Sequence, residues 1–204
     1  MNRKEYLRQQ IIGRITNSNW KKLLEQPFFI EKDFGYTADK SEYIKNKECF
    51  SKLPDLNNKT VVEIGCNFGM NSFIFASQFP EIKLYAFDIK KKNIEMANLI
   101  LEYYTACDQY YNIIFYVDDF REVDYADFDW AIISCFGNSY LDTLSKINLL
   151  KRKNFHGKII LRYPFWDRNG VKRYSHKYIR KTIDKTLKNF NCELIVNELI
   201  IIAT

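Results

Sequence analysis

From Thr60 onward, short apolar runs rich in β-branched and aromatic residues alternate with longer helical patterns. This alternation is typical of βαβ units, in which helices join neighbouring parallel strands and cover the sheet. It predicts an α/β fold with a doubly wound, mostly parallel sheet of seven strands. The expected strands lie near residues 60–64, 82–87, 112–117, 129–134 and 157–163, with a final pair within 192–203.

Four helices are expected between these strands, near residues 69–79, 91–106, 139–151 and 174–189. In the second helix, an apolar stripe at helical spacing is typical of a core-facing surface and indicates no function by itself. The pair proposed for the end of the chain depends on a break at Asn197 and Glu198, and one longer strand fits the same residues nearly as well.

Residues 1–58 do not share this rhythm and are interpreted as helices around a loop. The segment 28–36 is too aromatic for an ordinary solvated loop, which suggests a lid. We therefore expect one compact domain, with a helical N-terminal extension (1–58) and a ligand-binding core (59–204).

The five cysteines are odd in number and scattered, without a CxxC pair, so neither a disulfide framework nor a zinc site is indicated. No metal site is predicted. The chain shows neither a signal peptide nor an apolar run of the roughly 18 residues that a membrane span needs. A cytoplasmic protein without a membrane partner is expected, and the sequence does not indicate its oligomeric state.

The net charge of +6 is unevenly distributed. Residues 151–188 contain 13 Lys and Arg against 2 Asp and Glu, which gives +11 and leaves −5 for the rest of the chain. A basic stretch of this kind attracts nucleic acid or an anionic substrate, but the solvated face of an amphipathic helix is the commoner explanation.

The segment Glu63–Gly69 joins a buried strand to a helix through a loop with glycines four residues apart. Such a loop lets a ligand approach the backbone closely. The dinucleotide fingerprint G-x-G-x-x-G would need glycine where this chain has Asn67 and Met70. Because a side chain at position 67 would crowd a pyrophosphate, NAD and FAD are disfavoured.

The pattern E-x-G-x-x-x-G after a strand resembles the first motif of the class I, Rossmann-like, S-adenosylmethionine-dependent methyltransferases. The resemblance covers roughly residues 59–204 and implies S-adenosylmethionine as the cofactor. In that family, an acid that ends the second strand holds the ribose hydroxyls. Asp88 stands there, and the alternative is that it only caps the next helix.

Family members often place an acid after the third strand to accept from the adenine amino group. Asp119 fits this position best, and Asp118 is the alternative. The cofactor-binding residues that the resemblance implies are Glu63, Gly65, Cys66, Asn67, Gly69, Asp88, Ile89, Asp118, Asp119, Phe120 and Cys135.

The substrate side is expected after the fourth and fifth strands, where Phe136, Asn138 and Tyr163 are candidates, with Tyr36 closing over them from the lid. The chain lacks the [DN]-P-P-[FYW] tetrapeptide of base and glutamine N-methyltransferases. Methyl transfer from a sulfonium is an in-line displacement that mainly requires positioning, so no catalytic residue is assigned. His156 and His176 are interpreted as a turn residue and a solvated residue.

The favoured interpretation is a methyltransferase that acts on a small molecule. An RNA- or nucleotide-directed methyltransferase is the first alternative. In the remaining alternatives, the protein transfers the aminocarboxypropyl arm of the cofactor or serves as a non-catalytic partner.

Overall fold

The structure is a computed structural model, and it describes residues 1–14, 50–51, 53–134, 146–150, 152–153, 155–163, 192–195 and 199–203. Within these residues, seven strands form one sheet in the order β3-β2-β1-β4-β5-β7-β6. The strands are β1 (Thr60–Ile64), β2 (Lys83–Asp88), β3 (Ile113–Val117), β4 (Trp130–Ser134), β5 (Lys158–Tyr163), β6 (Cys192–Ile195) and β7 (Leu199–Ala203).

The first five strands are parallel, whereas β7 runs antiparallel to both β5 and β6. The predicted α/β fold with a parallel sheet is therefore confirmed. The five parallel strands begin and end within two residues of the predicted positions, because their apolar runs are bounded by polar residues and turns.

Strand β1 lies at the centre of the parallel part, between β2 and β4. The chain builds outward from β1 to β3 and then returns to the other side of β1, which makes β1 and β4 the neighbours at the topological switch point. In open α/β sheets, ligands bind beyond the carboxyl ends of the strands at this point. Ile64 pairs with Phe87 and with Ile133, so β1, β2 and β4 end side by side.

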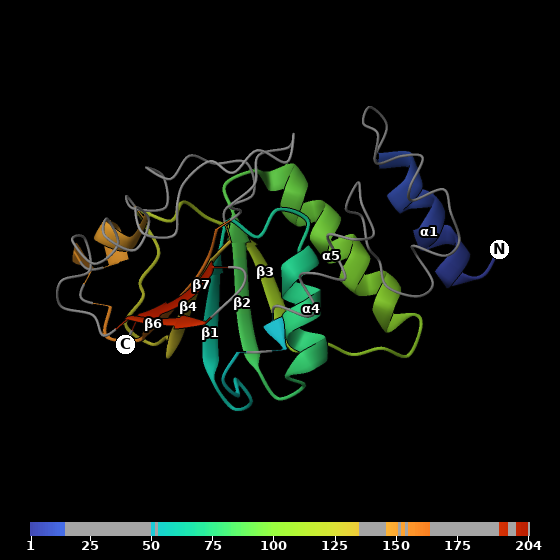
Figure 1. Cartoon of the computed structure of the whole chain (residues 1–204). Coiled ribbons are helices and arrows are strands. Elements are labelled where there is room, and N and C mark those ends of the chain that lie inside the picture. Colours follow the sequence, from blue (N-terminus) through green and yellow to red (C-terminus); the bar gives the residue numbers. More distant parts are fainter. Residues whose placement is uncertain are drawn as a thin grey trace, which may run out of the picture.

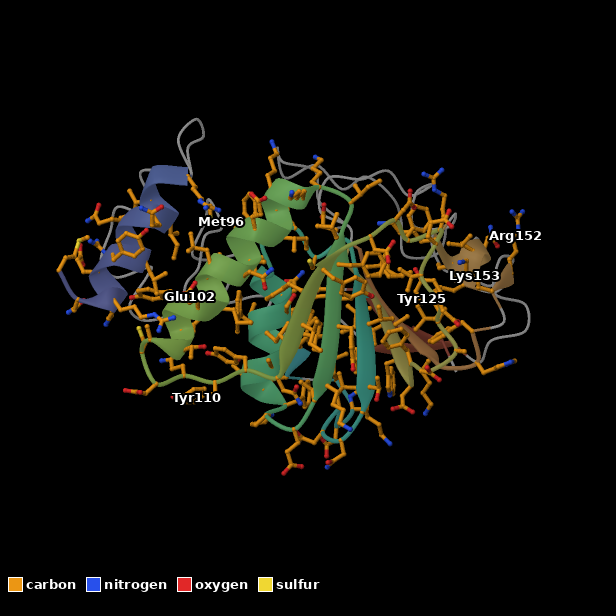
Figure 2. The ribbon with its side chains drawn as sticks, turned by 180° about the vertical axis from the view of Figure 1, so that it is seen from behind. Met96, Glu102, Tyr110, Tyr125, Arg152 and Lys153 are labelled. Atoms are coloured by element: carbon orange, nitrogen blue, oxygen red, sulfur yellow. The ribbon has the colours of Figure 1, made fainter. Side chains whose placement is uncertain are left out.

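Helices α4 (Met70–Gln78) and α5 (Lys91–Thr105) pack on strands β2 and β3. Helix α1 (Arg3–Arg14) packs on α5 and lies outermost (Figure 1). Its Leu7 and Ile11 are buried in the main hydrophobic core, and Arg3 forms an ion pair with Glu102. Figure 2 shows Glu102 on α5 beside α1. The described part of the N-terminal extension therefore packs as a core helix, and residues 15–49 lie outside the described residues.

An aromatic cluster fixes the distance between α4 and the edge of the sheet. Phe73 of α4 contacts the rings of Tyr104, Tyr111 and Phe115 at centroid distances of 5.1–5.7 Å. Rings at such separations attract one another beyond the effect of area burial alone. The cluster holds the first turn of α4, and with it the preceding loop, against β3.

Candidate functional site

The loop Gly65–Gly69 turns sharply at the carboxyl end of β1. The backbone N–H groups of Gly65 and Cys66 both donate to the carbonyl oxygen of Phe87 at 2.9 Å, so the loop is tied to the neighbouring strand. Gly65 has φ +75° and is exposed, while Cys66 is buried. The loop therefore presents backbone without a side chain at its first residue.

Asn67 occupies the place where a glycine would complete E-x-G-x-G-x-G. Its φ is +54°, a left-handed conformation that asparagine tolerates better than most residues. Its side chain is exposed, and its backbone N–H donates to Asp88 Oδ2 at 3.1 Å. Position 67 thus needs a residue that accepts positive φ, and this explains why asparagine substitutes for glycine there.

Gly69 is required by packing. Its φ is +82°, and a Cβ at this residue would lie 2.6 Å from Phe115 Cζ and 3.3 Å from Phe73. The close approach of α4 to β3 leaves no room for a side chain. Gly69 therefore positions the helix, whereas the part of the loop that is open to a ligand is around Gly65.

Glu63 is fully buried in β1 directly before the loop. The Ser72 hydroxyl donates to its Oε2 at 2.5 Å, and Oε1 accepts no hydrogen bond of normal geometry from the described residues. Burial raises the pKa of the Glu63 carboxyl to about 7, against the lowering effect of Ser72 and Asn71. This acid is therefore poised to change protonation near neutral pH.

Asp88 ends β2 and joins two parts of the site. Its Oδ1 accepts from the Lys90 backbone N–H at 2.8 Å and from Asn93 Nδ2 at 3.2 Å, and its Oδ2 accepts from the Asn67 N–H. The carboxylate thus caps the start of α5 and fastens the glycine loop. Ile89 beside it is exposed.

Asp118 and Asp119 follow β3 and differ in their partners. The Asp119 carboxylate accepts from the Arg121 backbone N–H and forms an ion pair with its guanidinium, which lowers the pKa of Asp119 to about 2. Asp118 accepts from the Asp119 N–H through Oδ1, and no described residue donates to its Oδ2. Oδ2 of Asp118 is therefore more available as an acceptor than the carboxylate of Asp119. The carbonyl oxygen of Phe120 accepts from the Tyr125 hydroxyl.

Two neighbouring groups are kept neutral by burial. Burial, together with the charges of Glu63 and Asp88, raises the pKa of the Cys66 thiol. Burial followed by the charge of Asp118 raises the pKa of Tyr116 to about 12. A thiol held in this state is a poor nucleophile.

Lys146 was not among the residues predicted from the sequence, yet it approaches the loop. Its Nζ lies 3.7 Å from the position that a Cβ would take at Gly65. It lies in the helical residues 146–150, which are anchored by the buried side chains of Ile147 and Leu150. The local sequence does not distinguish Lys146 from the other basic residues, because Gly65, which it approaches, is far away along the chain.

Several predicted residues lie outside the described part of the chain: Tyr36, Cys135, Phe136, Asn138 and His176. Tyr163 is the last residue of β5, at the carboxyl edge of the sheet. His156 is exposed and lies before β5, at the opposite edge. Among the described residues, no group of three or more His, Cys, Asp and Glu is placed to hold a metal, and no helix is long and apolar enough to cross a membrane.

Curated proteins similar to this chain include two RNA-modifying enzymes. The chain is 33% identical over 138 residues to ribosomal RNA small subunit methyltransferase C of Buchnera aphidicola subsp. Baizongia pistaciae, covering 68% of this chain and 36% of that protein. It is 25% identical over 143 residues to ribosomal RNA small subunit methyltransferase G of Petrotoga mobilis, covering 59% of this chain and 60% of that protein. The chain thus spans about a third to three fifths of their lengths. No protein-family model matches the chain.

Solved structures with a similar fold include an S-adenosylmethionine-dependent methyltransferase from Aquifex aeolicus, with a TM-score of 0.57 and 13% identity over 89% of this chain and 95% of that one. The pyocyanin biosynthetic protein PhzM has a TM-score of 0.65 and 12% identity over 96% and 60% of the two chains. A mutant of MtNAS in complex with S-adenosylmethionine has a TM-score of 0.56 and 12% identity over 97% and 71%.

These structural likenesses concern the fold, and the curated relatives add a relationship in sequence. Both agree with the family that the motif after β1 resembled. The chain is related in sequence to the class I, Rossmann-like, S-adenosylmethionine-dependent methyltransferases and has their fold.

Proposed function

We propose that this chain is a methyltransferase that uses S-adenosylmethionine as its methyl donor. The observation that carries the proposal is the junction of the glycine loop with Asp88 at the switch point of the sheet. The Asn67 N–H is fastened to Asp88, so the two residues form one rigid corner. The cofactor-binding roles of Glu63, Gly65, Asp88 and their neighbours are part of the proposal.

The residues present fit such a ligand. Gly65 offers exposed backbone, and Asp88 offers a carboxylate to vicinal hydroxyls. S-adenosylmethionine supplies a methyl group on a sulfonium that is already activated for displacement. The protein then has to bind the two reactants, align them and exclude water. A general base is needed only where the accepting atom carries a proton.

For the substrate, we propose a small molecule held by residues that follow β4 and β5, with residues 1–58 as an extension that includes a lid. This rests on the aromatic composition of the segment 28–36, which would exclude water and wall a compact site. Residues 59–204 would form the catalytic core.

A specific observation supports RNA as a second candidate substrate, because both curated relatives are ribosomal RNA methyltransferases. The basic stretch 151–188 agrees with this candidate. Binding to RNA would weaken steeply with salt, since neutralised phosphates release counterions. A flat salt response of RNA binding would remove this candidate and leave the small molecule.

Product analysis tests the proposed reaction. The protein is incubated with labelled S-adenosylmethionine and either cell RNA or a small-molecule extract, and the nucleoside product is identified. Methyl transfer leaves S-adenosylhomocysteine. Accumulation of methylthioadenosine instead would show transfer of the aminocarboxypropyl arm and would overturn the proposal.

A further inference from the structure

Lys146 is the cation that lies against the glycine loop. Its Nζ is 3.7 Å from the Cβ position of Gly65, and Gly65 itself is exposed. The lysine is half-buried, and the buried side chains of Ile147 and Leu150 fix the helical residues that carry it. The ammonium is thus held at the loop by packing of its own segment.

No described carboxylate neutralises this lysine. The ion pairs of the described residues join Arg3 to Glu102, Arg8 to Glu5, and Arg121 to Asp119. Glu63, the nearest acid along the chain to Gly65, accepts from Ser72, and no ion pair among the described residues joins it to Lys146. A half-buried ammonium that forms no ion pair with any described residue suits an anionic group on a ligand.

The surrounding charges decide what kind of anion fits. Asp88 and Asp118 line the ends of β2 and β3, and the guanidinium of Arg121 is already paired with Asp119. A ligand with several negative charges would be repelled by these acids. A zwitterionic ligand with one carboxylate matches the ammonium of Lys146 together with the nearby carboxylates of Asp88 and Asp118.

We propose that Lys146 binds the carboxylate at the amino-acid end of S-adenosylmethionine. This inference rests on the proposed function and adds a specificity-determining residue to the same site. The positive φ of Gly65 favours glycine at this point, and the Lys146 ammonium lies at van der Waals distance from the position that a Cβ would take there. Asp88 and Lys146 then recognise opposite ends of one ligand, the ribose and the carboxylate.

Calorimetric titration with S-adenosylmethionine and with its decarboxylated analogue tests the assignment, because the two ligands differ in the carboxylate alone. In Lys146→Gln, we expect affinity for S-adenosylmethionine to fall about tenfold or more, with affinity for the analogue unchanged. Lys146→Arg keeps the charge and should restore most of the binding. Lys83→Gln removes an exposed lysine at the amino end of β2 and serves as the matched control.

The possible outcomes distinguish a failure of the role proposed for Lys146 from a failure of the proposed function. Equal losses for both ligands, or no loss for either, would overturn the role of Lys146 while leaving the proposed function intact. An RNA phosphate as the true partner of Lys146 would appear as unchanged cofactor binding together with weaker RNA binding, which also overturns the assignment. A wild-type chain that binds neither ligand would overturn the proposed function itself, and the role of Lys146 with it.

Discussion

At the scale of single residues, Asp88 links the glycine loop to the start of α5. It caps the beginning of α5 through the Lys90 N–H and fastens the glycine loop through the Asn67 N–H. Since Oδ1 already accepts two hydrogen bonds, a ribose hydroxyl would be received mainly at Oδ2. Cofactor binding and loop geometry are therefore coupled through one carboxylate.

Asp88→Asn tests this coupling with little change of shape. The variant loses the charge and one acceptor, so we expect binding of S-adenosylmethionine to weaken by about 1.5–3 kcal/mol, the usual contribution of a hydrogen bond to a charged group. Calorimetry measures this loss. Asp55→Asn is the control, because Asp55 is exposed and also accepts from a nearby backbone N–H, but precedes β1. Unchanged binding in Asp88→Asn would mean that Asp88 serves only as a cap.

The acids after β3 give a second test. The sequence favoured Asp119 as the acceptor for the adenine amino group, and the structure shows its carboxylate engaged by Arg121. We therefore expect Asp118→Ala to weaken binding of S-adenosylmethionine more than Asp119→Ala does. Equilibrium binding of both variants decides between them, and a larger loss in Asp119→Ala would return the role to Asp119.

The raised pKa of the buried Glu63 carboxyl predicts that the stability of the protein depends on pH. Its pKa is raised to about 7 from an ordinary value of 4.5, so the folded state retains a proton that the unfolded state loses between these values. The wild type should therefore lose stability relative to Glu63→Gln as pH rises from 4.5 to 7, by at most about 3 kcal/mol, and the difference should stay constant above that.

Urea unfolding of both proteins from pH 4.5 to pH 8 measures this difference. Glu95→Gln removes an exposed carboxylate from α5 and provides the control. A difference between wild type and Glu63→Gln that is independent of pH would show that Glu63 is not protonated in the folded protein.

At the scale of secondary-structure elements, Gly69 sets how closely α4 approaches the sheet. Gly69→Ala would force a side chain into a left-handed backbone and against the ring of Phe115, so we expect a loss of about 1–3 kcal/mol in unfolding free energy. Gly13→Ala in α1 meets nothing within 4 Å and should instead raise stability by up to about 1 kcal/mol. Equal effects of the two substitutions in chemical denaturation would contradict this account.

The elements were more predictable from the sequence than the contacts of the site. Apolar periodicity located the strands because a buried parallel strand must be apolar along its length, and the glycines marked the loop because positive φ excludes most residues. The pairing of Asp119 with Arg121 and the approach of Lys146 to Gly65 depend on side-chain conformation and on contacts across more than 80 residues. The first contact depends on the conformations of two neighbouring side chains and the second on the tertiary fold, so neither follows from apolar periodicity.

At the scale of the whole molecule, charge is divided between regions. Asp88 and Asp118 lie at the carboxyl ends of β2 and β3, whereas the basic excess belongs to residues 151–188. Figure 2 shows Arg152 and Lys153 at the end of the molecule opposite α1. Lys153 donates to the Val123 carbonyl at 3.0 Å, so one of these cations has a structural role, while Arg152 is exposed. An RNA substrate is expected to contact the basic residues 151–188. A small-molecule substrate is expected to contact mainly the carboxyl ends of the parallel strands.

Calorimetric titration of the full chain with S-adenosylmethionine tests the central claim most directly. The account predicts saturable binding at a single site, together with a rise in the unfolding temperature as ligand is added, because a ligand that binds only the folded state stabilises it. An absence of both the binding heat and the thermal shift would contradict the claim that the loop after β1 holds this cofactor.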